Sequence, residues 1–241
     1  MLALARRDLL HFFTTPLAWL VLAVWLALSN WVFYTFGLQA AREAGGSVRP
    51  LFMTSLGFGA QLLLVLAPAI TMNAFAGERQ GNTMPLLLSC PLSDWQLVGG
   101  KFLGSWVMLL SLLAATLFQP LALALLAEAG GLQLLGGYLG LALYLAVLAA
   151  IGNLISVLVD SPIAAYVISF GVFFVLQLFS VLAEHGQGFL AELGWIFGLG
   201  LRADAAIAGD LQLGHGLWLL SACGLALVLS HGVLRYRRLH G

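Results

Sequence analysis

Six long stretches without a charged side chain decide what this chain can fold into. They cover residues 9–41, 50–77, 102–127, 129–159, 161–183 and 211–234. Each is longer than the roughly 20 apolar residues with which a helix crosses about 30 Å of hydrocarbon, and none alternates as a membrane β-strand does. The sequence therefore predicts six membrane-spanning helices. Their expected cores lie near 17–37, 52–76, 103–126, 137–158, 163–183 and 216–234.

The overall composition excludes a soluble globular protein. Only 8% of the 241 residues are charged and 61% are hydrophobic, whereas a soluble domain carries roughly 25% charged residues. The formal net charge is zero, so no basic field points to nucleic acid as a partner. We expect an all-α polytopic membrane protein with one transmembrane domain over residues 1–241.

The positions of the Lys and Arg residues predict the orientation in the membrane. With six spans, both termini and the even-numbered loops lie on one side. That side holds Arg6, Arg7, Arg79, Lys101, Arg235, Arg237 and Arg238, and the other holds Arg42, Arg49 and Arg202. Because cytoplasmic segments are enriched in Lys and Arg, the count predicts both termini in the cytoplasm.

Residues 1–15 have the pattern of an amphipathic helix ahead of the first span. At 100° per residue, one face carries Leu2, Ala5, Leu9, Phe12 and Phe13, and the other carries Arg7, His11 and Thr14. Such a helix can lie in the cytoplasmic interface, and Pro16 ends it. We expect an elbow helix marked by Arg6, Arg7, Phe12 and Phe13. Extending the first span over Arg6, Arg7 and Asp8 would be costly.

The loop between the second and third spans, residues 78–101, is predicted to be cytoplasmic yet is strongly apolar. Its large apolar side chains are Met84, Leu86, Leu87, Leu88, Leu92 and Trp95. Apolar side chains exposed on the cytoplasmic side indicate a docking partner or a position against the membrane surface. An ordinary interfacial hairpin fits the pattern equally well, and the pattern alone does not choose between these interpretations.

A capping signal predicts how this loop enters the third span. Ser93 and Gln96 have the spacing of a capping box, which starts a helix at Asp94 that continues through Lys101. A short helical piece is expected before it, bounded by breaks. The breaks are Gly81, Pro85 and Pro91.

The segment 184–210, predicted to lie outside, contains a second unusual apolar run. Residues 193–201 read LGWIFGLGL, which is too short to span a membrane. A re-entrant or interfacial hairpin fits this run, because a loose loop would leave Trp195 and its apolar neighbours in water. Gly194, Gly198 and Gly200 would permit the reversal of the chain.

Several kinds of chemistry lack their signature in this sequence. No Asp, Glu, Lys or Arg lies within the six predicted cores, which disfavours a proton- or sodium-driven carrier. A phosphate-binding P-loop, a GxSxG nucleophile motif and spaced metal ligands are all missing. We therefore expect no enzyme activity, cofactor or metal in this chain itself. An intramembrane enzyme or scaffold without an ATPase partner remains the alternative.

The cytoplasmic loop resembles the first cytoplasmic loop of type-2 ABC transporter permeases. That loop reads F-x-x-E-x-x-x-G-T-x-x-x-L-x-x-x-P-x-S-x-x-Q-x-x-x-x-K. The matching residues are Phe75, Glu78, Thr83, Leu87, Pro91, Ser93, Gln96 and Lys101. Gly81 stands one place early, and Pro85 replaces a helix-favouring residue. Residues 6–29, 156–170 and 201–221 resemble the gliding-motility-like branch of that family, so the likeness covers almost the whole chain.

The resemblance implies a machine of four parts in the bacterial inner membrane. Two permeases, a homodimer or two related chains, would work with a cytoplasmic ATPase dimer that binds ATP and Mg²⁺. The residues expected at the ATPase are Glu78, Thr83, Leu87, Pro91, Ser93, Trp95, Gln96 and Asp160. Re-entrant helices before the last span are also implied, here marked by Gly194, Trp195 and Gly198.

The sequence leaves two ideas for what the machine does. One is export of an apolar or lipid-linked compound. The other is a relay of ATP-driven motion to an extracytoplasmic accessory protein, suggested by the nearly charge-free interior and the acidic outer segment. Membrane lipid is the remaining partner expected, and no residue pattern identifies a substrate.

Overall fold

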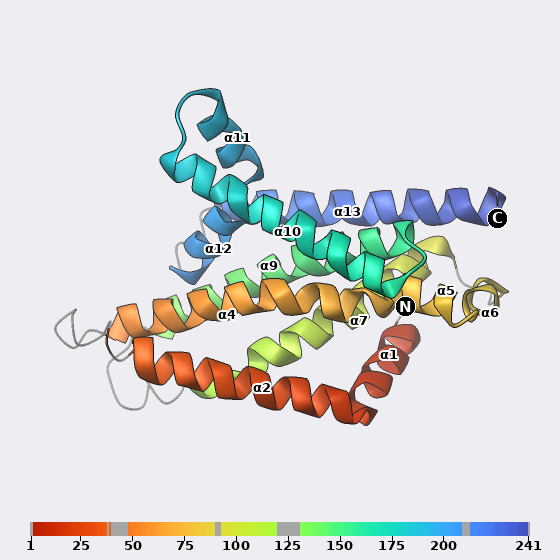
Figure 1. Cartoon of the computed structure of the whole chain (residues 1–241), viewed down its shortest axis with the longest axis horizontal. Coiled ribbons are helices and arrows are strands. Elements are labelled where there is room, and N and C mark those ends of the chain that lie inside the picture. The colour runs from red at the N-terminus through yellow and green to blue at the C-terminus, as the bar shows by residue number, and fades with distance from the viewer. Residues whose placement is uncertain are drawn as a thin grey trace.

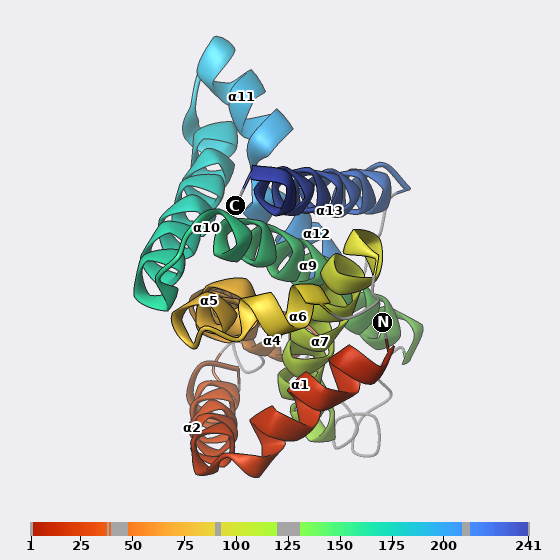
Figure 2. The same cartoon turned by 90° about the vertical axis from the view of Figure 1, so that its right-hand side faces the viewer.

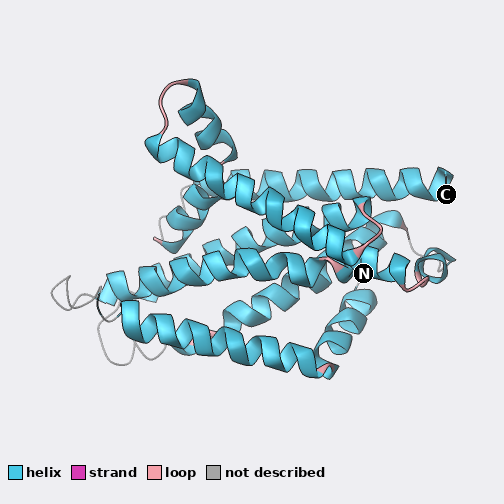
Figure 3. Ribbon diagram, viewed as in Figure 1, coloured by secondary structure: helices cyan, strands magenta, loops and turns pink. Residues whose placement is uncertain are grey.

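The computed structural model describes residues 2–37, 39, 48–89, 93–119, 131–208 and 213–240. Within these ranges it consists of helices joined by short turns, without a strand (Figures 1 and 3). The helices are α1 Leu2–Thr14, α2 Pro16–Val32, the π-helix η1 Phe33–Gly37, α4 Val48–Thr71, the π-helix η2 Asn73–Gly77, α5 Glu78–Gln80, α6 Met84–Ser89, α7 Asp94–Ala115, α9 Gly131–Leu158, α10 Pro162–His185, α11 Phe189–Phe197, α12 Leu199–Ile207 and α13 Leu213–His240.

Six segments of the described chain are long and apolar enough to cross a membrane, which confirms the predicted fold class. They are Ala18–Phe36, Met53–Gln80, Asp94–Ala115, Leu135–Leu158, Pro162–His185 and Leu213–Arg238. The third span differs from its predicted range, because its helix begins at Asp94 and ends at Ala115. Thr116 follows as the C-cap, and its hydroxyl donates to the carbonyl oxygen of Leu113 at 2.7 Å.

Helix α9 forms the centre of the bundle. It contacts α4, α7, α10, α12 and α13, and the two perpendicular views show it between them (Figures 1 and 2). Its Tyr144, Leu145 and Leu148 are fully buried. A helix that is apolar all round is suited to such a position, because every face needs cover. Helices α2, α10 and α13 instead expose apolar side chains outward, as spans facing lipid do.

Helix α1 is separate from the first span, as the position of Pro16 predicts. Pro16 occupies the first position of α2, where its missing N–H costs nothing. The chain turns at Thr15 so that α1 crosses α7 on one side of the bundle (Figure 2). Leu4 and Ala5 are buried, whereas Arg6 and Leu10 are exposed.

A π-helical turn follows α4 near the end of the second span. In η2 the backbone departs from the α-helical hydrogen-bond pattern, and Ser156 of α9 supplies partners. The Ser156 hydroxyl accepts from the backbone N–H groups of Phe75 and Ala76 and donates to the carbonyl oxygen of Met72, each at 3.0 Å. One buried hydroxyl thus fixes the end of α4 to the central helix.

The region between α10 and α13 folds into the short helices α11 and α12. The chain reverses after α10 near Gly188, which has a φ of 60°, and turns again at Gly198 between the two short helices. The predicted reversal at Gly194 and Gly200 is therefore wrong, since both lie inside helices. Gly194 packs against α10, where a Cβ atom would stand 2.4 Å from the amide nitrogen of Ala183.

Arg202 in α12 stabilises this region. Its buried guanidinium donates to the carbonyl oxygens of Gly198, Trp195 at 2.7 Å and Ile196 at 3.4 Å. It also lies 3.9 Å from the centre of the Trp218 ring in α13. Trp195 and Ile196 belong to the last turn of α11, where carbonyl groups lack helical N–H partners. Arg202 therefore both satisfies this helix end and joins it to the last span.

Candidate functional site

Ion pairs gather at the end of the bundle that holds both chain termini. This charged end comprises α1, the loop 78–101, the turn 158–162 and the last turns of α13. Its helices meet at the right of Figure 1 and face the viewer in Figure 2. These segments come together because α1 precedes the first span, and the others follow the second, fourth and sixth spans. With six crossings, all of these positions lie on the side of the two termini.

Lys101 is the centre of the first cluster. Its ammonium group lies 3.0 Å from Asp8 Oδ2 and 2.9 Å from Glu78 Oε1, and its side chain is only 4% exposed. Arg7 adds a second cation, 3.0 Å from Asp8 and 2.7 Å from Glu78. Two carboxylates and two cations therefore hold α1, α5 and the first turns of α7 together. The two carboxylates compensate the positive charge of the buried Lys101 ammonium group.

Glu78 is the residue of this cluster that belongs to the loop itself. Besides the two cations, it accepts a hydrogen bond from the hydroxyl of Thr83. The Thr83 backbone N–H also donates to the Glu78 carbonyl oxygen at 2.9 Å. Asn82 lies between these two residues and has a φ of 54°, in the turn that joins α5 to α6. Glu78 and Thr83 thus define the shape of the loop at its base.

A second cluster joins the loop to the turn between α9 and α10. Asp160 accepts from Arg79 and from Arg237, each at 2.8 Å. Both arginines also donate to backbone carbonyls at the end of α9, Arg79 to Val159 and Arg237 to Leu158. Hydrogen bonds from Arg237 and Arg79 lower the pKa of Asp160 below its ordinary value. The loop, the turn and α13 are thereby linked.

The predicted capping box at Ser93 is confirmed. The Ser93 hydroxyl accepts from the Gln96 backbone N–H at 3.3 Å, and the Gln96 side chain accepts from the Ser93 N–H at 3.1 Å. The helix begins at Asp94, whose carboxylate lies 2.7 Å from Arg238 of α13. Trp95 stacks on His231 of α13 with ring centres 4.3 Å apart. The start of α7 is thus bound to the last helix.

The sequence analysis expected the leucine side chains of this loop to be exposed, and for Leu87 this prediction is wrong. The side chains of Leu86, Leu88 and Leu92 lie outside the described part of the structure. Leu87 is 7% exposed, because it packs with Met84, Leu4 and Leu97 in a small core of the chain's own side chains. Helices α1 and α7 cover Leu87, for which the sequence analysis expected a docking partner or the membrane surface. Pro91 lies outside the described residues. The exposed side chains of the loop include Thr83, Ser93, Trp95 and Gln96.

The predicted elbow residues have different environments. Arg7 joins the Lys101 cluster, whereas Arg6 is exposed. Phe12 and Phe13 are half-buried and contact each other edge to face at 5.4 Å. Of the residues predicted near α11, Gly194 and Gly198 are buried and Trp195 is exposed. Their position relative to a membrane stays a prediction.

Sequence reasoning missed Asp8, Arg79, Lys101 and Arg237 as site residues. The sequence did contain a signal for them, because all four charged residues belong to segments predicted on the same side of the membrane, together with residues of opposite charge. Among the described residues, no group of three or more His, Cys, Asp or Glu side chains is arranged to hold a metal ion.

Known proteins are similar to this chain in sequence. A family profile described as "ABC-2 family transporter protein" matches residues 39–193. The chain belongs to the ABC-2 family of transporter proteins. A protein named "Probable ABC transporter permease protein NosY" from Pseudomonas aeruginosa is 33% identical, with 84% of this chain and 86% of that protein covered. Its namesake from Stutzerimonas stutzeri is 28% identical over 83% of this chain and 86% of the relative.

This ABC-2 protein is accordingly a permease subunit of an ABC transporter. The family match includes the whole loop 78–101 and the turn at Asp160. Glu78, Lys101 and Asp160 therefore lie in the matched part of the chain, whereas their partners on α1 and α13 lie outside it. Neither comparison assigns the permease to the gliding-motility-like branch, which stays a prediction.

Proposed function

We propose that the charged end is where a separate cytoplasmic ATPase engages this permease and passes motion to its spans. The observation that carries the proposal is the Lys101 cluster, a buried ion network that fixes the base of the loop to α1 and α7. A loop that only connects two spans needs no such fastening. A loop that receives force does, because force reaches the helices only through contacts that hold their geometry.

Among the described side chains of the loop, Leu87 and Met84 belong to the permease's own core. The described side chains that are exposed near the start of α7 are Ser93, Trp95 and Gln96. Trp95 is 45% exposed although it stacks on His231. Tryptophan is one of the residues enriched at the energetic centres of protein interfaces.

A pull-down experiment with two tryptophan variants tests this assignment. The permease is co-expressed with a tagged P-loop ATPase taken from a neighbouring reading frame, and the amount of bound permease is measured after purification from membranes. We expect Trp95→Ala to weaken binding by about tenfold or more, as loss of a central interface aromatic does. Trp31→Ala is the matched control, because Trp31 is 56% exposed and has an aromatic neighbour at the opposite end.

Two results would contradict the proposal. Equal recovery of the ATPase with both variants would remove the loop from the interface. Purification of the wild-type permease without any ATPase, encoded nearby or bound, would favour the alternative of an intramembrane scaffold or enzyme. Leu87→Asp is unsuitable as a test, because a carboxylate in the small core would disturb folding as well as docking.

The proposal includes an arrangement in the membrane. Both termini face the cytoplasm of a bacterial inner membrane, α1 lies in the interface as an elbow, and α11 with α12 re-enters from outside. ATP and Mg²⁺ bind to the ATPase, and two copies of the permease or two related chains complete the machine. Reporter fusions that are active only in the cytoplasm, placed at each terminus, should both be active; activity at one terminus alone would contradict six crossings.

The outcome of the ATP-driven motion is either export of an apolar compound or a mechanical relay to an extracytoplasmic protein. An ATPase assay on the reconstituted complex separates the two. Stimulation by a small apolar compound alone supports export and contradicts the relay. Stimulation that requires an outer protein supports the relay.

A further inference from the structure

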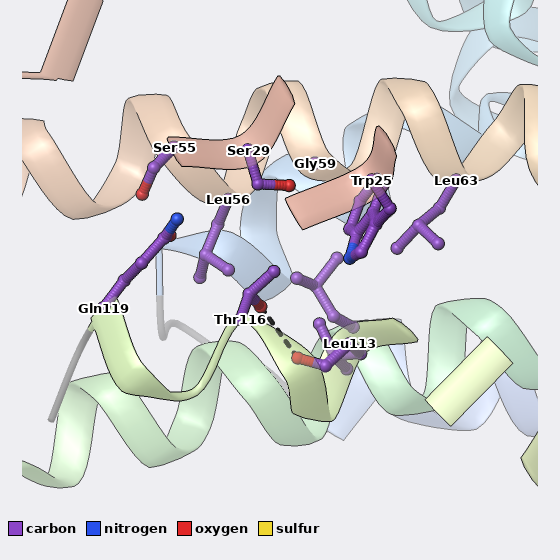
Figure 4. A pocket seen from close by; sticks show the side chains of 10 residues that line it. Trp25, Ser29, Ser55, Leu56, Gly59, Leu63, Leu113, Thr116 and Gln119 are labelled. Atoms are coloured by element: carbon purple, nitrogen blue, oxygen red, sulfur yellow. Dashed lines mark hydrogen bonds between the residues drawn. The ribbon is translucent and has the colours of Figure 1, made fainter. Parts of the chain in front are cut away.

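Two buried polar groups that have no partner among the described residues line one small cavity within the bundle. The cavity lies between α2, α4 and the end of α7, and four polar side chains line it (Figure 4). They are Ser29, Ser55, Thr116 and Gln119. Trp25 and aliphatic side chains close the rest of the wall. We name this cavity the Ser29–Gln119 pocket.

The unpartnered groups are the hydroxyl of Ser29 and the amide nitrogen of Gln119. Neither has a hydrogen-bond partner within the described part of the chain, and the two residues are only 7% and 4% exposed. An unsatisfied buried polar group costs on the order of 1–3 kcal/mol. Two such groups at the same cavity, contributed by different helices, indicate a shared ligand.

The size and lining of the cavity define that ligand. Its volume is about 10 Å³, close to the smallest that holds one water molecule. An acyl chain or a drug-sized compound does not fit. An ion is disfavoured because none of the lining residues is charged. The ligand must accept a hydrogen bond from the Gln119 amide and exchange one with the Ser29 hydroxyl, which a water molecule does.

We propose that the Ser29–Gln119 pocket binds a single ordered water molecule that bridges α2 to the end of α7. Thr116 offers a further acceptor at the same pocket. Its hydroxyl donates to Leu113 and lies 3.2 Å from the Tyr138 hydroxyl, which leaves one of its two lone pairs for the water. Buried waters usually make about three hydrogen bonds, which these groups supply.

The water is part of what holds α2 to the bundle. Trp25, one turn before Ser29, is buried and donates from its indole nitrogen to the Leu112 carbonyl oxygen at 2.8 Å. Much of α2 is otherwise exposed, including Trp19 and Leu20. Trp25 and the bridging water therefore provide two successive polar attachments between α2 and α7, in a region where lipid offers none.

Thermal unfolding of purified variants tests the proposal. Ser29→Ala should lower Tm by about 2–4 °C, because the water loses a partner while Gln119 stays buried. Ser169→Ala is the matched control. Ser169 is also fully buried with an unpartnered hydroxyl in the described chain, but it does not line the pocket. Its substitution should leave Tm unchanged or raise it.

The double variant Ser29→Ala with Gln119→Leu separates a shared water from two independent groups. One bridging water predicts a combined loss smaller than the sum of the single losses, since the second substitution removes the group that the first left unsatisfied. The proposal is overturned if Ser29→Ala raises Tm as much as Ser169→Ala does, or if the two losses add.

A map of the wild-type permease in lipid nanodiscs gives a readout that needs no variant. At a resolution that shows ordered waters, we expect one density peak within hydrogen-bond distance of both Ser29 Oγ and Gln119 Nε2. Direct pairing of these two groups with protein atoms, with no peak between them, would overturn the proposal.

Discussion

Removal of the Lys101 ammonium group should be far more harmful than removal of the neighbouring Arg7 guanidinium. In Lys101→Met, Asp8 and Glu78 lose their buried cation, and Arg7, whose side chain is half-exposed, remains as their shared partner. Breaking a buried ion pair from one side costs about 3–5 kcal/mol. Because Arg7 stays and the carboxylates are not fully buried, we expect the lower value of about 3 kcal/mol.

The assay is thermal unfolding of the permease in detergent. For a chain of this size, 1 kcal/mol moves Tm by about 2–4 °C, so Lys101→Met should lower Tm by about 6–12 °C. Arg7→Met removes an exposed cation, whose pairs are worth about 0–1 kcal/mol, and should lower Tm by no more than about 4 °C. Equal losses in the two variants would refute the argument from burial.

A triple variant examines the same reasoning from the opposite direction. When Lys101→Met is combined with Glu78→Gln and Asp8→Asn, the unpaired negative charges disappear together with the cation. Much of the lost Tm should then return, because the cost of the single change comes from uncompensated carboxylates rather than from the missing attraction. A triple variant less stable than Lys101→Met alone would mean that the cluster acts through packing or through its remaining hydrogen bonds.

Two further predictions concern helix contacts. Ser156→Ala should destabilise the permease by about 2 kcal/mol, because it leaves the buried N–H groups of Phe75 and Ala76 without their acceptor. The control Ser221→Ala changes an exposed serine and should have no measurable effect on Tm. Gly194→Val should reduce the yield of folded protein on size-exclusion chromatography, because α11 must separate from α10. Gly171→Val, at a position on α10 with open space around it, should not.

The features that the sequence predicted are those governed by nearby residues. The spans follow from uninterrupted apolar runs, the end of α1 from Pro16, and the start of α7 from a capping box only four residues long. Each of these signals acts within a few turns of helix. Their physical cause is therefore contained in the local sequence.

The candidate site depends on contacts between distant residues, and this explains the failures. Glu78 pairs with Lys101 across the loop, and Asp160 pairs with Arg79 and Arg237, about 80 residues away on either side. Leu87 appeared unpartnered because its cover comes from α1 and α7. The sequence predicted these groups on one side of the membrane, but the packing of the helices, such as α1 against α7, decides which of them meet.

The distribution of these contacts also bears on how motion at the loop would reach the spans. If the ATPase moved the loop 78–101, the covalent connections alone would pass that motion to α4 and α7. The Lys101 cluster adds α1, Asp160 adds the ends of α9 and α10, and the Trp95 stack adds α13. Ser156 further prevents η2 from absorbing the motion by unwinding. A displacement of the loop would therefore shift α1, α9 and α13 with it, so uncoupling should follow from loss of these side-chain contacts even when both covalent connections are intact.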